Sequence, residues 1–232
     1  MNNYKKNIKL LTENHVYSKD MEHDACGVGV IASTEGKKSR DIVEHGIEAL
    51  KAVWHRGAVD ADGKTGDGAG IHVEIPKDFF IEKIEVTGHD YDNSEICVGM
   101  IFLPRNDYSA QESCKTIVES ELTKNDFSIF GWRQVPVNPK VLGEKAFHTM
   151  PEIIQVLFKS NDTNLIDKNL ERKIYETRKK IENKAFELSL NNFYICSISS
   201  KSIIYKGLYL AEAISDFYLD LKDKRFISRY AI

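Results

Sequence analysis

The sequence contains no long hydrophobic run, little cysteine and no excess of basic residues. None of its apolar stretches reaches the roughly 18 residues that a membrane-spanning helix requires, and residues 1–25 lack the apolar core of a secretory signal. The 32 lysines and arginines against 35 acidic residues give a net charge of −3, so no basic surplus indicates nucleic-acid binding. We therefore expect neither a membrane nor a nucleic acid as a partner.

Cysteine occurs at four positions, with no CxxC pair. This scarcity is typical of a cytoplasmic protein with free thiols. Cys97 and Cys196 lie in strand-like runs and are expected to be small buried residues, whereas Cys114 carries no signal. His23 and Cys26 have the spacing of metal ligands, but a structural zinc needs four ligands and no second cysteine pair exists, so we predict no metal site.

The apolar pattern predicts strands in groups, with helices inserted between the groups. A helix is expected over residues 40–55, capped by Ser39 and ended by Gly57. Its buried face is predicted to contain Val43, Ile47, Leu50 and Trp54. Further helices are expected over 108–123 and 163–188, and strands over 27–33, 71–76, 96–104, 127–137 and 152–159. Residues 193–207 are expected to form a hairpin that turns around 200–202. Because regular βαβ alternation is weak, we predict an α+β fold.

The stretch "EHDACGVGVIAS", residues 22–33, places Cys26 directly before glycines and an apolar run. If residues 1–25 are removed as a leader, Cys26 carries both a thiol and a free α-amine. An α-amine with a pKa of about 7.7–8.0 is suited to act as a general base at neutral pH. A nucleophile activated by its own terminal amine needs no separate histidine or aspartate.

These motifs have two other interpretations. An isolated cysteine before a strand is more often structural than catalytic. The stretch "DGKTGDG", residues 62–68, also invites a phosphate-loop interpretation, but the required G-x-x-x-x-G-K-[ST] pattern places its first glycine at position 58, which is Ala58. Asp60 and Asp62 would also repel phosphate.

Taken together, several motifs resemble one known family. "EHDACGVGVIAS" is followed by "HRGAVDADGKTGDGAGIHVEIPKDFF", and later by "GWRQVPVNPKVLGEKAFHTMPEIIQVLF" and "FYICSISSKSIIYKGLYLAEAISDFYLDL". In this order they resemble the start of the glutamate synthase large chain, a class II glutamine amidotransferase domain, over about residues 17–232.

The resemblance implies a fold and an activity. It implies an N-terminal-nucleophile hydrolase fold, a four-layer αββα sandwich that is incomplete in this chain, with residues 1–25 as a leader and 26–232 as the amidotransferase domain. It implies that Cys26 attacks glutamine, releasing ammonia that is added to 2-oxoglutarate. It also implies no cofactor in this chain, with FMN and an iron–sulfur cluster in the full-length protein. The implied partners are the remainder of the large chain and a small subunit.

The resemblance also assigns residues around Cys26. Carried onto this sequence, Arg56 with Gly57 shapes the substrate pocket beside the nucleophile, and Asp67 orients its neighbours by hydrogen bonds. From the residues alone, the favoured interpretation of Arg56 is a surface arginine at a helix end, where the helix dipole favours a cation, and only the resemblance reverses this order. The loop "TGDGAG" around Asp67 is equally interpretable as an ordinary turn before a strand.

The family pattern continues past this chain. Members of the family have an arginine motif for the glutamine carboxylate and an Asn-Gly pair for the oxyanion hole, both expected after Ile232. Losing one oxyanion donor costs about 10²–10³ in rate. We therefore expect that this chain is truncated and that it has little or no glutaminase activity alone. The alternative is a non-catalytic remnant that serves as a binding or assembly module.

Overall fold

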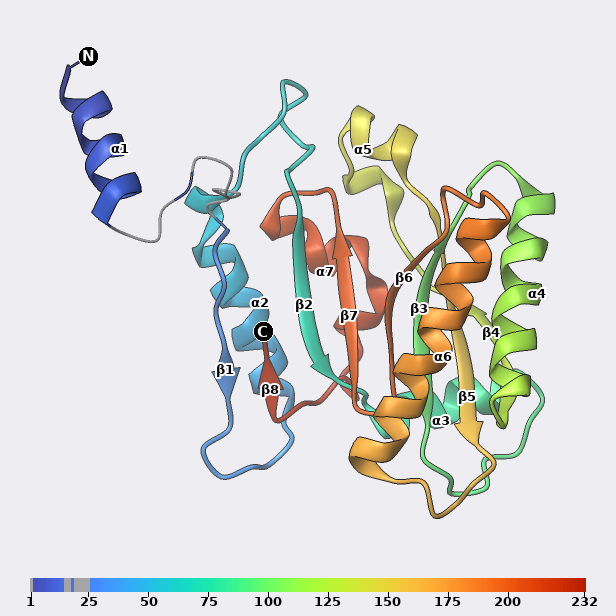
Figure 1. The fold of residues 1–232 in the computed structure, drawn as a ribbon. Helices are drawn as coiled ribbons and strands as arrows, with labels where there is room; N and C mark the ends of the chain where they lie inside the picture. Colours follow the sequence, from blue (N-terminus) through green and yellow to red (C-terminus); the bar gives the residue numbers. More distant parts are fainter. Residues whose placement is uncertain (1, 15–17, 19–25) are drawn as a thin grey trace.

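The computed structural model describes residues 2–14, 18 and 26–232. Helices and strands together form an α+β fold (Figure 1). The α-helices are α1 (Asn2–Asn14), α2 (Arg40–Ala52), α3 (Lys77–Val86), α4 (Tyr108–Lys124), α5 (Glu144–Thr149), α6 (Asp167–Glu187) and α7 (Ile214–Phe217). Short 3₁₀ turns are η1 (Trp54–Arg56), η2 (Pro139–Val141), η3 (Ala211–Ala213) and η4 (Leu219–Lys222).

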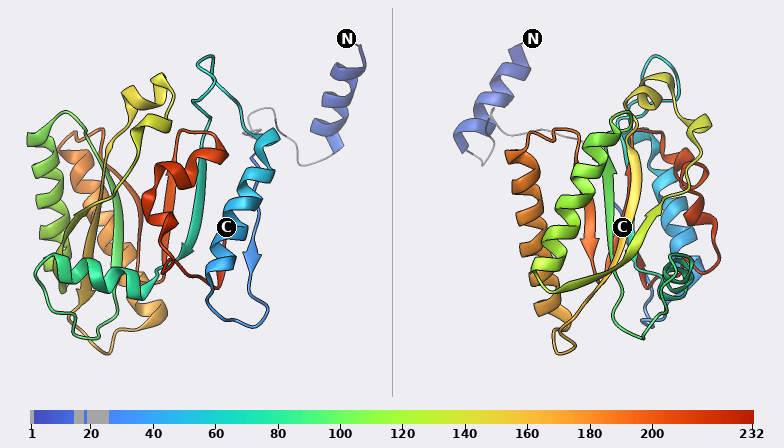
Figure 2. Two further views of the ribbon diagram at one scale, coloured as in Figure 1. Left: turned by 180° about the vertical axis from the view of Figure 1, so that it is seen from behind. Right: turned by 90° about the vertical axis from the view of Figure 1, so that its right-hand side faces the viewer.

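The strands form two antiparallel sheets. They are β1 (Ile31–Ala32), β2 (Ala69–Glu74), β3 (Cys97–Leu103), β4 (Phe127–Gln134), β5 (Glu152–Ser160), β6 (Tyr194–Ser199), β7 (Ser202–Gly207) and β8 (Tyr230–Ala231). The first sheet has the order β1-β8-β2-β7, and the second has the order β4-β5-β3-β6. Seen from the side, the strands lie between α4 and α6 on one side and α2 and α7 on the other (Figure 2).

The strand predicted over residues 27–33 is wrong for most of its length. β1 contains only Ile31 and Ala32, because β8, the strand with which it pairs, is itself two residues long. The strand predicted over residues 127–137 ends early, at Gln134, shortly before Pro136, which has no N–H for a ladder. The other predicted strands match β2, β3 and β5 within two residues.

The hairpin predicted over residues 193–207 is wrong. Both strands exist, but β6 pairs with β3 in the second sheet, while β7 pairs with β2 in the first. The chain crosses from the second sheet to the first between β6 and β7. The carboxylate of Glu171 on α6 fixes this crossing, because it accepts hydrogen bonds from the Ser199 hydroxyl at 2.9 Å and from the Ser200 amide at 2.7 Å. This crossing joins the two sheets in the chain.

Helix α2 begins as predicted and ends earlier. The Ser39 hydroxyl accepts a hydrogen bond from the Ile42 amide at 3.4 Å, which confirms the predicted cap. The helix ends at Ala52, and the chain then tightens into η1. Gly57 ends that 3₁₀ turn instead, donating its N–H to the Trp54 carbonyl. The prediction that Gly57 caps the long helix is therefore wrong.

Helix α2 packs closely on the first sheet. Val43 and Ile47 are buried as predicted. A methyl group at Gly46 would come within 2.4 Å of the Ala231 side chain, so only glycine allows α2 to lie this near β8. This contact fixes the helix against the strand that pairs with β1.

The cap of α2 supports a stability prediction. Replacing Ser39 with alanine leaves an orphan N–H in the first turn, so we expect the free energy of unfolding to fall by about 0.5–2 kcal/mol. Urea unfolding measures the loss. Ser39→Asp serves as the control, because aspartate also caps helices, and equal losses for both variants would contradict the capping role.

Helices α4 and α6 cover the second sheet. The stripe predicted for the longer helix is largely confirmed, since Leu170, Ile174, Ile181 and Ala185 are buried. Ile166 and Leu188 are exposed instead, because they flank the ends of α6 rather than lying within it. Cys114 on α4 is also fully buried against this sheet, a position that its polar surroundings did not signal.

A buried polar network connects the two sheets. Arg133 on β4 donates to both carboxylate oxygens of Asp220 in η4, at 2.8 and 2.5 Å. Arg133 also donates to Gln155 on β5 at 2.6 Å, and Tyr205 on β7 donates to Asp220 at 3.0 Å. Burial raises the pKa of Tyr205 far above its ordinary value, so the hydroxyl stays protonated and donates. We call these four residues the Arg133–Asp220 network.

None of the described helices is both long enough and apolar enough to cross a membrane. The prediction had no counterpart for α1 in the leader, for α3 or for α5. Helix α3 buries Phe79, Phe80 and Ile84.

Candidate active site

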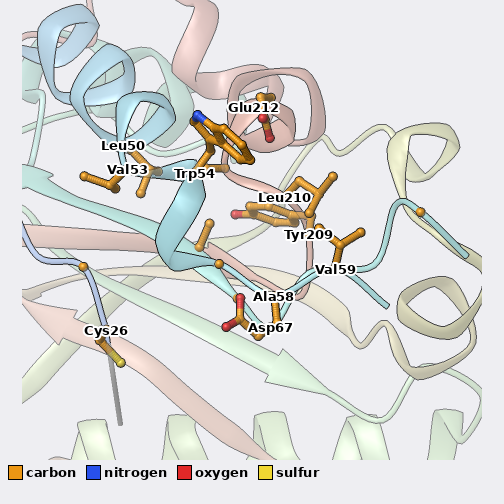
Figure 3. A pocket seen from close by; sticks show the side chains of 16 residues that line it. Cys26, Leu50, Val53, Trp54, Ala58, Val59, Asp67, Tyr209, Leu210 and Glu212 are labelled. Atoms are coloured by element: carbon orange, nitrogen blue, oxygen red, sulfur yellow. The ribbon is translucent and has the colours of Figure 1, made fainter. Parts of the chain in front are cut away.

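A cavity of about 360 Å³ lies beside Cys26. It is enclosed by the end of α2, by the loop that precedes β2 and by the segment that follows β7 (Figure 3). The lining residues are Cys26, Gly27, Leu50, Val53, Trp54, Gly57, Ala58, Val59, Gly63, Asp67, Gly68, Ala69, Tyr209, Leu210, Ala211 and Glu212. Three of the four residues predicted to form the site, Cys26, Gly57 and Asp67, therefore meet at one cavity.

Cys26 is the one cysteine of the chain that is exposed. It precedes β1, whose position is fixed by pairing with β8 and by a hydrogen bond from the Ser33 amide to the Arg229 carbonyl at 2.8 Å. Cys97 and Cys196 are buried, as predicted. Burial raises the pKa of Cys196, like that of Cys114, to about 11.

These differences predict selective thiol chemistry. At pH 8, a thiol with a pKa near 11 is about 0.1% thiolate, and the thiolate is the reactive form. Iodoacetamide should therefore modify Cys26 first in the native protein and all four cysteines in urea. Peptide mass spectrometry locates the adducts, and early modification of Cys114 or Cys196 in the folded chain would contradict the assignment.

The loop between η1 and β2 folds back on itself. The Asp67 amide donates to the Ala58 carbonyl at 3.3 Å, and Val59 forms an isolated bridge with Gly66. A methyl group on Gly66 would lie 2.5 Å from the Tyr209 carbonyl oxygen, so glycine allows the loop to touch the segment after β7. This contact brings two distant parts of the chain to one cavity.

The tip of the loop excludes the phosphate-loop interpretation. The Asp62 carboxylate accepts hydrogen bonds from the amides of Lys64 and Thr65 at 2.9 and 2.7 Å. These amides already bind a carboxylate of the loop itself and are not free to bind a phosphate. The pKa of Asp62 is lowered most by the hydrogen bond from the Thr65 hydroxyl, and further by the hydrogen bonds from these two amides. The strand β2 follows, whereas the phosphate-loop motif opens a helix.

Gly57 and Asp67 lie close together at the cavity wall. A methyl group on Gly57 would lie 3.5 Å from Asp67 Oδ1. The chain thus places a carboxylate near the point where η1 ends. The orienting hydrogen bonds predicted for Asp67 remain a prediction.

Arg56 is the last residue of η1, directly before Gly57. Its side chain lies outside the described part of the structure, as does His23. The role predicted for Arg56 therefore remains a prediction. Within the described residues, no group of three or more histidine, cysteine and acidic side chains could hold a metal ion.

Sequence reasoning missed Trp54 as a cavity residue. It was assigned to the buried face of a helix, but its side chain is 66% exposed. Because α2 ends at Ala52 and the chain continues as a tighter turn, Trp54 leaves the buried stripe and reaches the cavity.

The segment after β7 was also missed. Tyr209, Leu210 and Glu212 line the cavity, and Figure 3 shows Glu212 next to Trp54. No local motif identifies these residues, because their place depends on the contact between Gly66 and the Tyr209 carbonyl.

Residues 26–232 match the family described as glutamine amidotransferases class-II. This range covers most of the chain, and the chain therefore belongs to that family, whose domain has the N-terminal-nucleophile hydrolase fold. The chain is 51% identical over 229 residues to the glutamate synthase [NADPH] large chain of Azospirillum brasilense, covering 99% of this chain and 15% of that protein. It is also 40% identical over 213 residues to the ferredoxin-dependent glutamate synthase 1 of Arabidopsis thaliana, covering 91% of this chain and 13% of that protein. The chain thus spans less than a sixth of these relatives.

Proposed function

We propose that this chain is the glutaminase region of a glutamate synthase large chain, in which it hydrolyses glutamine to glutamate and ammonia. The observation that carries the proposal is the position of Cys26. It is the exposed cysteine, it lies on the wall of the cavity, and it is the first residue of the family match. No observation favours the alternative of a non-catalytic binding or assembly module.

The proposed reaction begins after residues 1–25 are removed, which leaves 26–232 as the amidotransferase domain. The terminal amine of Cys26 takes the proton from the thiol, and the thiolate attacks the side-chain amide carbon of glutamine. The tetrahedral intermediate collapses as the amine returns the proton to the leaving nitrogen, releasing ammonia. Water then hydrolyses the thioester, which yields glutamate and restores the thiol.

The neighbouring residues have supporting roles in this proposal. Arg56 and Gly57 shape the pocket beside the nucleophile, and Asp67 orients its neighbours. The position of Gly57 and Asp67 at the cavity wall supports this assignment. The arginine for the glutamine carboxylate and the oxyanion Asn-Gly pair would come from the remainder of the large chain.

The proposal extends to the architecture of the domain. We infer a four-layer αββα sandwich, which this chain forms incompletely. The packing of α2 on the first sheet and of α4 and α6 on the second supports it.

The cofactors of a glutamate synthase, FMN and an iron–sulfur cluster, would lie in the remainder of the large chain. The residues described here do not fit such a cluster, because three cysteines are buried singly on β3, α4 and β6. Ammonia would be passed on to 2-oxoglutarate there. The partners proposed are glutamine, the remainder of the large chain and a small subunit, in the cytoplasm, with neither nucleic acid nor membrane involved.

An electrophilic glutamine analogue, 6-diazo-5-oxo-norleucine, tests the proposal. We expect it to label Cys26 in the full-length large chain, to stop glutamine hydrolysis, and to be excluded by excess glutamine. Intact mass should show that the active protein begins at residue 26. An adduct at another residue, or an active protein that still begins at Met1, would overturn the proposed mechanism. The 232-residue chain alone should release little ammonia.

A further inference from the structure

The leader helix α1 has an apolar side that belongs to neither hydrophobic core of the described residues. Figure 1 shows α1 apart from the body of the protein, and both views in Figure 2 agree. Ile8 and Leu11 lie one turn apart on the same side of this helix, whereas Leu10 lies about 160° around the helix axis from Ile8 and about 100° from Leu11. A 13-residue helix without packing is marginal in water, and α1 has no acidic residue in its first turn and no basic residue in its last. Its stability therefore requires a surface to pack on.

The mouth of the cavity exposes apolar side chains. Trp54 and Val59 line it and are 66% and 56% exposed. Val28 and Val30, on the segment that joins Cys26 to β1, are 82% and 66% exposed. Two exposed apolar side chains at the cavity wall, Trp54 and Val59, indicate a surface that another element covers, and Val28 and Val30 expose more apolar area on the segment that follows Gly27.

The two surfaces have opposite charges. Lys5, Lys6 and Lys9 give α1 a positive side, with Glu13 as its one acidic residue. Among the described residues that line the cavity, the charged side chains are Asp67 and Glu212, both acidic. Charge complementarity of this kind orients docking partners and is weakened by salt.

The chain also holds the two surfaces near each other. Residues 15–25 separate α1 from Cys26, which is itself on the cavity wall. At roughly 3.5 Å per residue, this stretch limits the separation to about 40 Å. A tether this short gives the helix a high effective concentration at the cavity, so weak contacts suffice.

We propose that α1 docks in cis across the mouth of the cavity, with Ile8 and Leu11 against Trp54 and Val59, and that it covers Cys26 until the leader is removed. The docking of α1 does not depend on whether Cys26 is a nucleophile, but its role in protecting a nucleophile rests on the proposed function. Leader removal then has two effects, since it frees the α-amine of Cys26 and opens the cavity.

Alkylation of Cys26 in the 232-residue chain tests the docking without any need for glutaminase activity. If a tenth of the molecules are open, a bulky maleimide reacts about tenfold more slowly than with a permanently open cavity. We therefore expect the double substitution Ile8→Asp with Leu11→Asp to raise the alkylation rate about tenfold. Deletion of residues 1–14 should have the same effect, and 0.5 M salt should raise the rate in the unaltered chain.

Leu10→Asp is the control, because it adds one aspartate to the same helix outside the side formed by Ile8 and Leu11, and it should leave the rate within twofold of the unaltered chain. Urea midpoints equal to that of the unaltered chain confirm that the body remains folded. Equal rates in the unaltered, doubly substituted and deleted chains would overturn the docking, as would an equal effect of Leu10→Asp. Protection that increases with protein concentration would also overturn it, because α1 would then dock on a second copy. Failure of the glutamine analogue to label Cys26 would count against the proposed function alone.

Discussion

Replacing Cys26 with alanine in the full-length large chain is expected to reduce glutamine hydrolysis on the order of 10⁴-fold or more. Removing the nucleophile abolishes the covalent route and leaves only the residual rate that comes from substrate binding and charge stabilisation. The terminal amine of residue 26 remains, so the loss reports on the sulfur. Ammonia release from glutamine is the measurement.

The control is Cys114→Ala, which removes a thiol that is buried on α4 and that stays protonated at neutral pH, because burial raises its pKa to about 11. Its rate should stay within about twofold of the unaltered protein, because Cys114 belongs to the core of the second sheet and is not one of the residues that line the cavity. Intact mass must show that both proteins begin at residue 26, so that an uncleaved leader does not imitate a lost nucleophile. Glutamine hydrolysis that survives in Cys26→Ala would show that another residue attacks the substrate.

Replacing Asp220 with alanine is expected to lower the free energy of unfolding by about 3–5 kcal/mol. The variant leaves the Arg133 guanidinium buried without its counter-ion, and an uncompensated buried charge is strongly destabilising. The side chains of Arg133 and Asp220 are 11% and 3% exposed, so water cannot replace the lost partner fully. Urea unfolding measures the change.

Two further variants separate the buried charge from other effects of the Arg133–Asp220 network. Asp220→Leu combined with Arg133→Met removes both charges and should recover most of the loss, since apolar replacements of buried ion pairs are often neutral. Asp216→Ala breaks the exposed pair with Lys222 and should cost less than about 1 kcal/mol. A double substitution as unstable as Asp220→Ala would show that lost packing, rather than the buried charge, dominates.

Local patterns in the sequence predicted most individual elements. The spacing of Leu170, Ile174, Ile181 and Ala185 identifies α6, because a single helical face is buried and every residue of that face belongs to one segment. β3 and β5 are apolar runs whose burial on both faces is visible in the sequence itself.

Pairing between distant segments was not predictable in this way. The sequence of residues 193–207 reads as a hairpin, since neither strand carries information about its partner, but β6 and β7 join different sheets. β1 is short because β8 is short, and β8 lies at the other end of the chain. Helix α3 buries the adjacent residues Phe79 and Phe80 in its first turn, which obscures its helical period.

The site shows the same division. Cys26, Gly57 and Asp67 lie in motifs that single them out, and the structure places all three at the cavity. Trp54 was misassigned because the helix ends two residues before it. Tyr209 and Glu212 have no motif, and only the close approach of Gly66 brings them to the site.

The pairing of β1 with β8 also sets an order of events during biosynthesis. Ile31 lies opposite Ala231, so the ribosome must add the intervening residues before this ladder can close. At roughly 5–20 residues per second, the delay is about 10–40 s. During that interval the emerging thiol has no finished pocket around it, although β3, β4 and β5 of the second sheet can already pair. A nascent chain stalled before residue 230 should therefore protect backbone amides in those strands while leaving those of β1 open to exchange.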